Sequence, residues 1–357
     1  MAGKVFFRLR ISWKKLAAAA AVVLAAAAGT MICLRYRAKT FATVRFHMDT
    51  FISYYVGSVL PERTVDAMDK AVEDCEDLFD RFSADSEISR VNANAGTMTE
   101  VSEETYLLVE DAIKLAAETG GYFDPTVGMI SDIWGFGIDP HVPEKEEIAA
   151  ALQYVGFGRV MLEEKNGQYY VCVGEGQSLD LGGIAKGYAL RKVREAAEKA
   201  GCRFAVVSFG GNVLLVGAGH DGNDGFSVGI RTPEENITDP ALIISLEGGV
   251  VSTSGGYERF FMEDGVRYCH IIDPFTGNCA GGDLLSVSVI CDDPVRADCL
   301  STAYFVKGLD STLDALASGE FSGIAIDSDK VIYISEDLAG SVAPEGTADG
   351  YRIEVVG

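Results

Sequence analysis

Residues 179–189, Leu-Asp-Leu-Gly-Gly-Ile-Ala-Lys-Gly-Tyr-Ala, combine the residue types that hold an anionic ligand. Gly182 and Gly183 carry no Cβ, so the backbone there can approach a ligand closely. A helix-spaced apolar run follows them, and the unpaired amides of a first helical turn favour an anion. Lys186 adds a positive charge and Asp180 adds an acceptor. The pattern indicates a phosphate-bearing ligand, although a glycine pair before a helix is more often only a tight turn.

A second set of polar residues lies on the helix that Pro294 is expected to begin. Asp298, Ser301 and Thr302 are three and four residues apart, so they share one helical face. A carboxylate with hydroxyls offers hard oxygen ligands, which magnesium takes when it also holds substrate phosphates. The alternative is a surface aspartate beside a serine and a threonine that bond back to their own helical turn.

His270 is the histidine with the clearest chemical setting. Alternation over residues 266–272 predicts a strand that carries it close to Asp273, where a turn begins. A histidine with a pKa near neutral can take a proton from a reacting hydroxyl. A lone strand histidine is, however, more often structural.

Aromatic side chains gather in residues 122–137, which glycines and a proline interrupt. Tyr122, Phe123, Trp134 and Phe136 could stack on a flat ring system, but aromatics in so short a segment are more often core. A second glycine pair, Gly210-Gly211, follows a predicted strand and could bring another backbone segment to the same ligand.

Strands alternate with helices along the chain, without a long linker or an internal repeat, which predicts a single unit over residues 41–357. Residues 81–96 are polar and are expected to form a loop. The other expected elements are strands at 41–56, 204–208, 226–230, 241–246, 250–253, 266–272 and 284–291, a hairpin at 160–173, and helices beginning at Pro61, Ser102, Glu144, after Gly183 and at Pro294.

Residues 16–34 carry no charge and are long enough to cross a bilayer as a helix. Cations are more numerous before this run than after it, which favours the N-terminus inside. Residues 1–40 are therefore expected to be an uncleaved single-span membrane anchor, with the rest of the chain outside the cytoplasm. The alternative is a cleaved signal peptide and a secreted or periplasmic protein.

The net charge of −23 argues against nucleic acid and anionic membrane surfaces as partners. An anionic ligand would therefore need local help from loops, lysines or a metal. The eight cysteines are scattered singly without a Cys-x-x-Cys pair, so small buried side chains are expected rather than a disulfide framework.

Together these motifs resemble the ApbE-like family, the FAD:protein FMN transferases. The resemblance covers residues 41 to 345, and its segments keep the family's order. They are Met48-Asp49-Thr50, residues 85–90, 123–128 with 134–137, 180–188, 210–212, 253–255, 270–277 and 297–302.

The resemblance implies an α+β fold, two-lobed and tandem T-fold-like, with mixed or antiparallel sheets flanked by helices. It implies magnesium-dependent transfer of FMN from FAD to a threonine or serine hydroxyl of another flavoprotein, with release of AMP. By position, His270 would be the general base. Magnesium would be held by Asp298, Thr302, the Gly183 carbonyl and Ser301. The FAD contacts would be Met48, Phe82, Tyr122, Phe123, Asp124, Asp180, Lys186 and Ile271.

Three positions depart from the family's pattern. Phe82 stands where a tyrosine is common, Gly256 replaces an acidic residue, and Phe275 replaces a frequent arginine. The acceptor motif, Ser/Thr-Gly-Ala-Thr/Ser, is absent from the chain. The modified residue is therefore expected on another protein, such as a membrane redox subunit.

Two alternative functions share much of this pattern. One is a metal-dependent FAD pyrophosphatase, in which water replaces the acceptor hydroxyl and FMN and AMP are released. The other is an exported flavin-binding protein without turnover, which would leave His270, Asp298 and Thr302 without a role.

Overall fold

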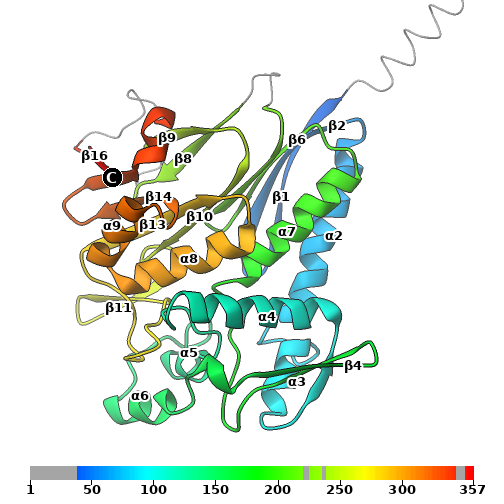
Figure 1. Cartoon of the computed structure of the whole chain (residues 1–357), viewed down its shortest axis with the longest axis vertical. Helices are drawn as coiled ribbons and strands as arrows, with labels where there is room; N and C mark the ends of the chain where they lie inside the picture. Colours follow the sequence, from blue (N-terminus) through cyan, green and yellow to red (C-terminus); the bar gives the residue numbers. More distant parts are fainter. Residues whose placement is uncertain (1–37, 220–224, 235–238, 343–349) are drawn as a thin grey trace, which may run out of the picture.

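A computed structural model describes residues 38–219, 225–234, 239–342 and 350–357 (Figure 1). The membrane segment expected at residues 16–34 lies outside these ranges. None of the helices within them is both long enough and apolar enough to cross a bilayer.

One nine-stranded sheet dominates the described part of the chain, in the order β1-β2-β6-β7-β10-β13-β14-β15-β16. Neighbouring strands pair antiparallel, except for the parallel pair β15–β16. The strands are β1 Lys39–His47, β2 Thr50–Ser58, β6 Phe204–Phe209, β7 Asn212–Gly217, β10 Gly249–Gly255, β13 Leu284–Cys291, β14 Ser322–Asp327, β15 Val331–Ser335 and β16 Arg352–Val356.

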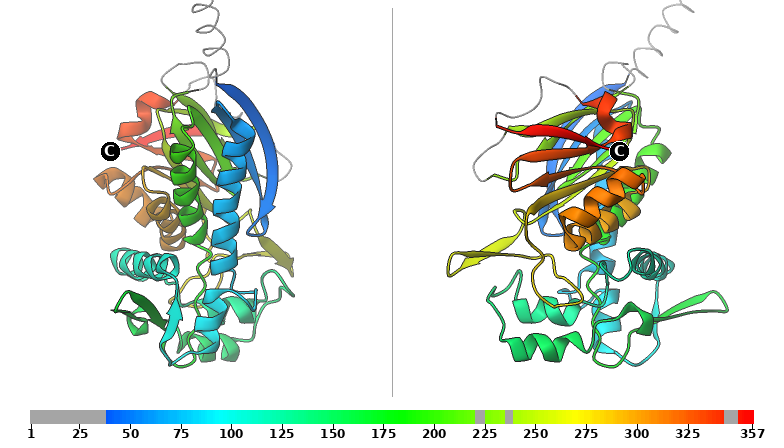
Figure 2. Two further views of the ribbon diagram at one scale, coloured as in Figure 1. Left: turned by 90° about the vertical axis from the view of Figure 1, so that its right-hand side faces the viewer. Right: turned by 60° about the vertical axis from the view of Figure 1, so that its left-hand side comes forward.

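Four helices cover one face of this sheet (Figures 1 and 2). They are α2 Pro61–Phe79, α7 Ala185–Lys199, α8 Pro294–Lys307 and α9 Leu309–Ser318. Side chains of a strand alternate between its two faces. Leu214 and Val250 accordingly belong to the core under the helices, whereas Leu215 and Val251 belong to a second core on the other face. The hairpin of β8 Phe226–Arg231 and β9 Pro240–Leu246, with the short helix η2 Glu336–Ser341, contributes to that second core.

A smaller lobe lies at one end of the sheet (Figures 1 and 2). Its three-stranded sheet has the order β3-β5-β4. The lobe contains α3 Glu87–Ala93, β3 Thr99–Val101, α4 Glu103–Glu118, α5 Gly128–Trp134, α6 Lys145–Leu152, η1 Phe157–Arg159, β4 Met161–Lys165 and β5 Gln168–Cys172. The hairpin of β11 Phe260–Glu263 and β12 Val266–Cys269 projects near the junction of lobe and sheet (Figure 2).

Residues 41–56, expected as one strand, form a hairpin instead. Met48 and Asp49 turn the chain with φ of 48° and 58°, and His47 pairs with Thr50. Positive φ is uncommon outside glycine, so no local residue type marked this turn. Glu76 of α2 holds the turn, because its Oε1 accepts from the Met48 amide at 2.6 Å.

Two other expected elements also differ. The predicted loop at 81–96 contains α3, whose N-terminus is capped by Ser86 accepting from the Ser89 amide. The strand expected over 266–272 ends at Cys269, so His270 lies just beyond it. The cysteines of the described chain are free, and Cys75, Cys172, Cys269 and Cys299 are buried, as expected.

Gly187 sets the distance between α7 and α8. A Cβ placed there would meet the Pro294 carbonyl oxygen at 2.3 Å and the Asp298 Cβ at 2.8 Å. The first turn of α7 therefore rests directly on the side of α8. This close approach, which requires glycine, brings the glycine turn at residues 182–183 to Asp298.

The substitution Gly187→Ala should lower the free energy of unfolding by about 1–3 kcal/mol, the usual cost of overpacking. Alanine also gains roughly 1 kcal/mol in helix propensity over glycine. The overpacking cost is expected to exceed this gain, because the new methyl group meets a backbone carbonyl that cannot easily move. Urea unfolding measures the difference. Gly158→Ala is the control, because a Cβ at Gly158 meets nothing within 4 Å. Equal stability of Gly187→Ala and the parent would contradict the close-packing argument.

Candidate active site

A cavity of about 430 Å³ lies between the smaller lobe and the end of the large sheet. Its wall is built from segments far apart in sequence, including the β1–β2 turn, the glycine turn before α7, the segment after β12 and the inner side of α8. The expected site residues that line it are Met48, Tyr122, Phe123, Asp124, Asp180, Gly183, Lys186, His270, Ile271, Asp298 and Thr302.

Two expected site residues lie elsewhere. Phe82 is exposed to solvent and lies under the Arg81 guanidinium, 5.1 Å from the ring centre. Ser301 is fully buried, and its hydroxyl lies 2.9 Å from the Ser254 hydroxyl and 3.0 Å from the Asp298 carbonyl oxygen. Neither is among the residues that line the cavity.

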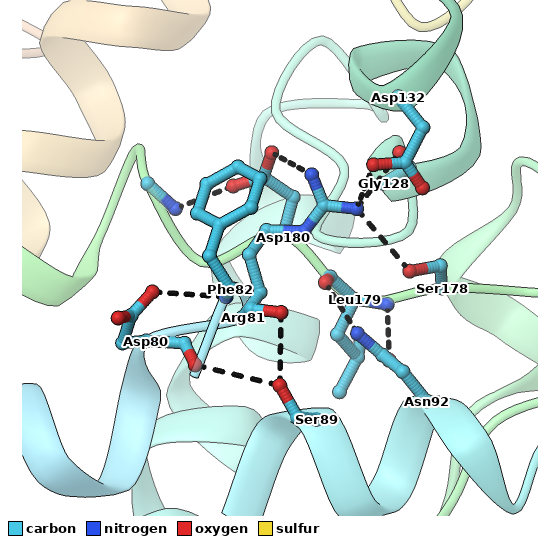
Figure 3. Close-up of polar contacts among 11 residues, drawn as sticks. Asp80, Arg81, Phe82, Ser89, Asn92, Gly128, Asp132, Ser178, Leu179 and Asp180 are labelled. Carbon is cyan, nitrogen blue, oxygen red and sulfur yellow. Dashed lines mark hydrogen bonds and ion pairs between the residues drawn. The ribbon is translucent and has the colours of Figure 1, made fainter. Parts of the chain in front are cut away.

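The smaller lobe fixes the extended segment that precedes the glycine turn (Figure 3). Asn92 of α3 exchanges two hydrogen bonds with the Leu179 backbone, at 2.7 and 3.0 Å. The Arg81 guanidinium bridges Asp132, at 2.9 Å, and Asp180, at 3.5 Å. Sequence reasoning missed both Arg81 and Asn92, because nothing local in residues 81–96 reveals partners so distant in the chain.

Asp180 organises the glycine turn itself. Its Oδ1 accepts from the Gly182 amide at 2.9 Å, and Lys186 Nζ donates to the Gly182 carbonyl at 3.2 Å. No side chain caps the start of α7. The partial positive charge of that helix start and the Lys186 ammonium group therefore meet on one side of the cavity.

The Asp298 carboxylate is buried, with only 3% of the residue exposed. One oxygen accepts from the Gly187 amide at 2.8 Å and the other from Asn212 Nδ2 at 2.9 Å. Both donors are uncharged, and buried charges in proteins are normally paired or coordinate a metal. The two uncharged donors compensate its charge only in part, so the site suits an additional cation.

Thr302 and the glycine turn lie beside Asp298, although the Thr302 hydroxyl bonds back to the Asp298 carbonyl oxygen at 3.2 Å. A Cβ at Gly183 would lie 3.4 Å from Thr302 Oγ1, so the glycine turn touches the same face of α8 as Asp298. A carboxylate, a hydroxyl and a backbone carbonyl form a donor set that suits Mg²⁺. In the part of the chain that the structure describes, no cluster of three His, Cys, Asp or Glu residues could hold a metal. A cation at Asp298 would therefore need further oxygens from water or ligand phosphates.

His270 lies half-buried on the cavity wall. Its ring Nδ1 is 3.2 Å from the Arg259 carbonyl, which can only accept, so Nδ1 carries the proton and Nε2 keeps its lone pair. Burial, with Lys186 and Arg259 as nearby cations, lowers the pKa of His270 to about 4. The ring is therefore neutral at neutral pH, with a pKa below the near-neutral value expected from the sequence.

Arg259 also ties His270 to the β1–β2 turn. Its guanidinium donates to the Asp49 carbonyl at 3.0 Å and pairs with the Asp49 carboxylate at 2.8 Å. Glu76 holds the other side of the turn through the Met48 amide and through His47 Nδ1 at 2.8 Å. The turn is thus fixed from α2 and from the segment preceding β11.

The aromatic residues divide between the cavity and the core. Tyr122 lines the cavity and meets the exposed Phe275 edge-on, with ring centres 4.9 Å apart. Trp134 is buried against Phe261 and Tyr268 and donates to the Gly277 carbonyl at 2.8 Å. Trp134 is therefore a core residue, which is the alternative that the sequence left open for these aromatics. Tyr122 remains available to a ligand.

Asp124 lines the cavity, but both of its carboxylate oxygens accept hydrogen bonds from within the protein. Its Oδ1 accepts from the Thr126 amide at 2.8 Å and from the Thr126 hydroxyl at 2.6 Å, and its Oδ2 accepts from the Phe157 amide at 3.0 Å. Burial raises the pKa of Asp124 despite these hydrogen bonds. Its main effect is to hold the chain that carries Phe123 against the glycine turn.

The substitution Arg259→Gln should raise the pKa of His270, because it removes a nearby positive charge that disfavours the protonated ring. The base then loses its proton only at higher pH, so the acidic limb of the kcat/KM profile should move to higher pH. That profile reports the free protein. Arg267→Gln, which removes a cation stacked over Phe260, is the control. An unchanged acidic limb in Arg259→Gln would contradict the electrostatic link.

The fold and the cavity define an α+β protein in which a lysine at a helix start, a buried carboxylate and a neutral histidine line one cavity. Residues 41–325 match the model of the ApbE family. The FAD:protein FMN transferase of Treponema pallidum is 36% identical over 253 residues, which cover 67% of this chain and 69% of that protein. The enzyme of the same name from Vibrio cholerae is 32% identical over 250 residues, 68% of this chain and 72% of that protein.

Solved structures agree with this similarity. The crystal structure of the ApbE protein from Thermotoga maritima matches with a TM-score of 0.77 and 34% identity, covering 84% of this chain and 98% of that chain. The flavin transferase ApbE from Vibrio cholerae matches with a TM-score of 0.74 and 26% identity, covering 85% of this chain and 99% of that chain. The chain belongs to the ApbE family.

Proposed function

We propose that this chain is an FAD:protein FMN transferase, which moves FMN from FAD to a threonine or serine hydroxyl of an acceptor flavoprotein and releases AMP. The observation that carries the proposal is the meeting of the glycine turn and α8, where the Gly187 amide binds the Asp298 carboxylate at 2.8 Å. His270 and Lys186 line the same cavity. The similarity to FAD:protein FMN transferases over two thirds of the chain supports the same reaction.

Asp298, Thr302 and the Gly183 carbonyl are the groups that would hold Mg²⁺, which when bound neutralises charge on the pyrophosphate of FAD. Lys186 and the first turn of α7 would add positive charge for the phosphates beside this group. Phosphoryl transfer depends mainly on such positioning and charge stabilisation. Tyr122 and Met48, which line the cavity, would offer non-polar contacts to the flavin end of FAD.

His270 Nε2 removes the proton of the acceptor hydroxyl, a contribution of roughly 10²–10⁴-fold. The hydroxyl oxygen forms a bond to the phosphorus of the FMN half, and the bond from that phosphorus to the bridging oxygen breaks. AMP leaves with the electron pair of that bond. No side chain of the enzyme acts as nucleophile, so no covalent enzyme intermediate is required.

The location of the chain, its acceptor and the relation between the two halves of the sheet are also proposed. We infer that residues 16–34 anchor the chain in the membrane with the described part outside the cytoplasm, where a membrane redox subunit with a Ser/Thr-Gly-Ala-Thr/Ser motif is the acceptor. We also retain the tandem T-fold-like relation between the halves of the sheet. Two helix pairs on one face of a largely antiparallel sheet, α2 with α7 and α8 with α9, support it.

The direct test combines the purified chain with FAD, Mg²⁺ and a flavoprotein domain carrying the acceptor motif. Mass spectrometry of the acceptor should detect covalent FMN, and chromatography should detect an equal amount of AMP. Release of FMN and AMP without modified acceptor would indicate the pyrophosphatase alternative. FAD that stays intact would indicate a flavin-binding protein.

In the same assay, Asp298→Asn should lower the rate of transfer by on the order of 10²–10³-fold, the usual cost of losing an electrostatic stabiliser. It should keep the fold, because the new amide can still accept from Gly187 and donate to Asn212 once the Asn212 amide turns over. Asp298→Ala is expected to cost about 1–3 kcal/mol for each donor left unpaired, so the asparagine variant is the cleaner probe.

The matched control is Asp293→Asn on the same helix. Asp293 caps α8 by accepting from the Val295 amide at 3.0 Å, and asparagine caps equally well, although it weakens the pairing with Arg191 of α7 at 2.9 Å. Full transfer activity in Asp298→Asn, with the control also active, would remove the carboxylate from the reaction.

A further inference from the structure

Three exposed apolar side chains lie together on the outer face of the β1–β2 hairpin. Val44, Phe46 and Phe51 are 54%, 56% and 69% exposed, and we call them the hairpin patch. Phe46 and Phe51 are directly paired across the strands, with ring centres 5.2 Å apart. Neighbouring aromatic side chains that remain in water are characteristic of interaction sites.

The pleat explains why this face lacks a partner within the described chain. Arg45 and His47 alternate with the patch residues and turn toward α2, where they pair with Asp69 and Glu76. Ile52, next to Phe51, is fully buried on the helix side. The helix layer therefore covers one face of the hairpin, and the patch is on the other.

The patch adjoins the mouth of the cavity. Met48, Asp49 and Thr50, which connect Phe46 and His47 to Phe51, all line the cavity. Glu76 and Arg259 fix this turn from two sides, so the patch is presented without a large loss of conformational entropy on binding. β1 is also an edge strand whose outer side has no strand partner among the described residues (Figure 2). An extended segment can add to such an edge through main-chain hydrogen bonds.

We propose that the hairpin patch is the docking surface for the acceptor flavoprotein, and that it binds an extended segment next to the hydroxyl that receives FMN. This inference rests on the proposed function. A macromolecular acceptor must bring its hydroxyl to His270, so it must contact the rim of the cavity. The chain carries a net charge of −23, and an apolar anchor binds without depending on the charge of the partner.

The test uses the double variant Phe46→Ser/Phe51→Ser in steady-state transfer to the acceptor domain, with FAD affinity measured separately by fluorescence quenching. KM for the acceptor should rise by about tenfold or more, as expected when an aromatic anchor is removed. The dissociation constant for FAD and the melting temperature should stay unchanged. An unchanged KM, or a parallel loss of FAD affinity, would overturn the proposal.

Val44→Ser and Val355→Ser form a matched pair. Both valines are 54% exposed, and they lie on β1 and β16, the two opposite edge strands of the sheet. Only Val44→Ser should raise KM for the acceptor. Equal effects of the two substitutions would show a general surface effect and would overturn the assignment.

Two further measurements test whether a second copy of this chain or a membrane, rather than the acceptor, binds the hairpin patch. Sedimentation of the parent and the double variant detects a second copy of this chain, and flotation with lipid vesicles detects a membrane surface. A change in either one together with an unchanged KM would overturn the proposal. Failure of the proposed function is distinct, because the parent chain would then yield no modified acceptor at all.

Discussion

The contact between α7 and α8 is the constraint on which the site depends. Gly187 lets the two helices approach until its amide binds the Asp298 carboxylate at 2.8 Å. Burying an ionised carboxylate costs free energy, and two uncharged donors compensate only part of that cost. A cation bound at the same oxygens would compensate the rest. The buried carboxylate thus has only uncharged donors as partners, at the cavity where the proposed function would bring the phosphates of a dinucleotide.

Positively charged side chains on the cavity wall act on His270. Lys186 and Arg259, together with burial, keep the pKa of the ring at about 4. A base of low pKa is always available at neutral pH but gains little driving force from taking a proton. Under the proposed function, a dinucleotide pyrophosphate bound beside these cations would offset their charge and would favour the protonated ring of His270. The base would therefore become stronger when the substrate is bound.

The sequence predicted which segments gather at the cavity better than the path of the backbone around it. The glycine turn, Lys186 and the polar face of α8 are marked by residue type and spacing, and the structure brings them together. The turn at Met48 and Asp49 could not be predicted, because tertiary contacts from Glu76 and Arg259 impose its positive φ. The same limit applies to Arg81 and Asn92, whose partners are distant in the chain, and to Ser301, whose hydroxyl turns inward to Ser254.

The central claim is that the glycine turn and α8 together form a cation site for a bound dinucleotide. It is tested most directly by anomalous diffraction from crystals grown with FAD and Mn²⁺ in place of Mg²⁺. The account predicts a peak within coordination distance of the Asp298 carboxylate, the Thr302 hydroxyl and the Gly183 carbonyl. A peak only elsewhere on this acidic protein, with FAD bound in the cavity and no metal beside Asp298, would contradict it.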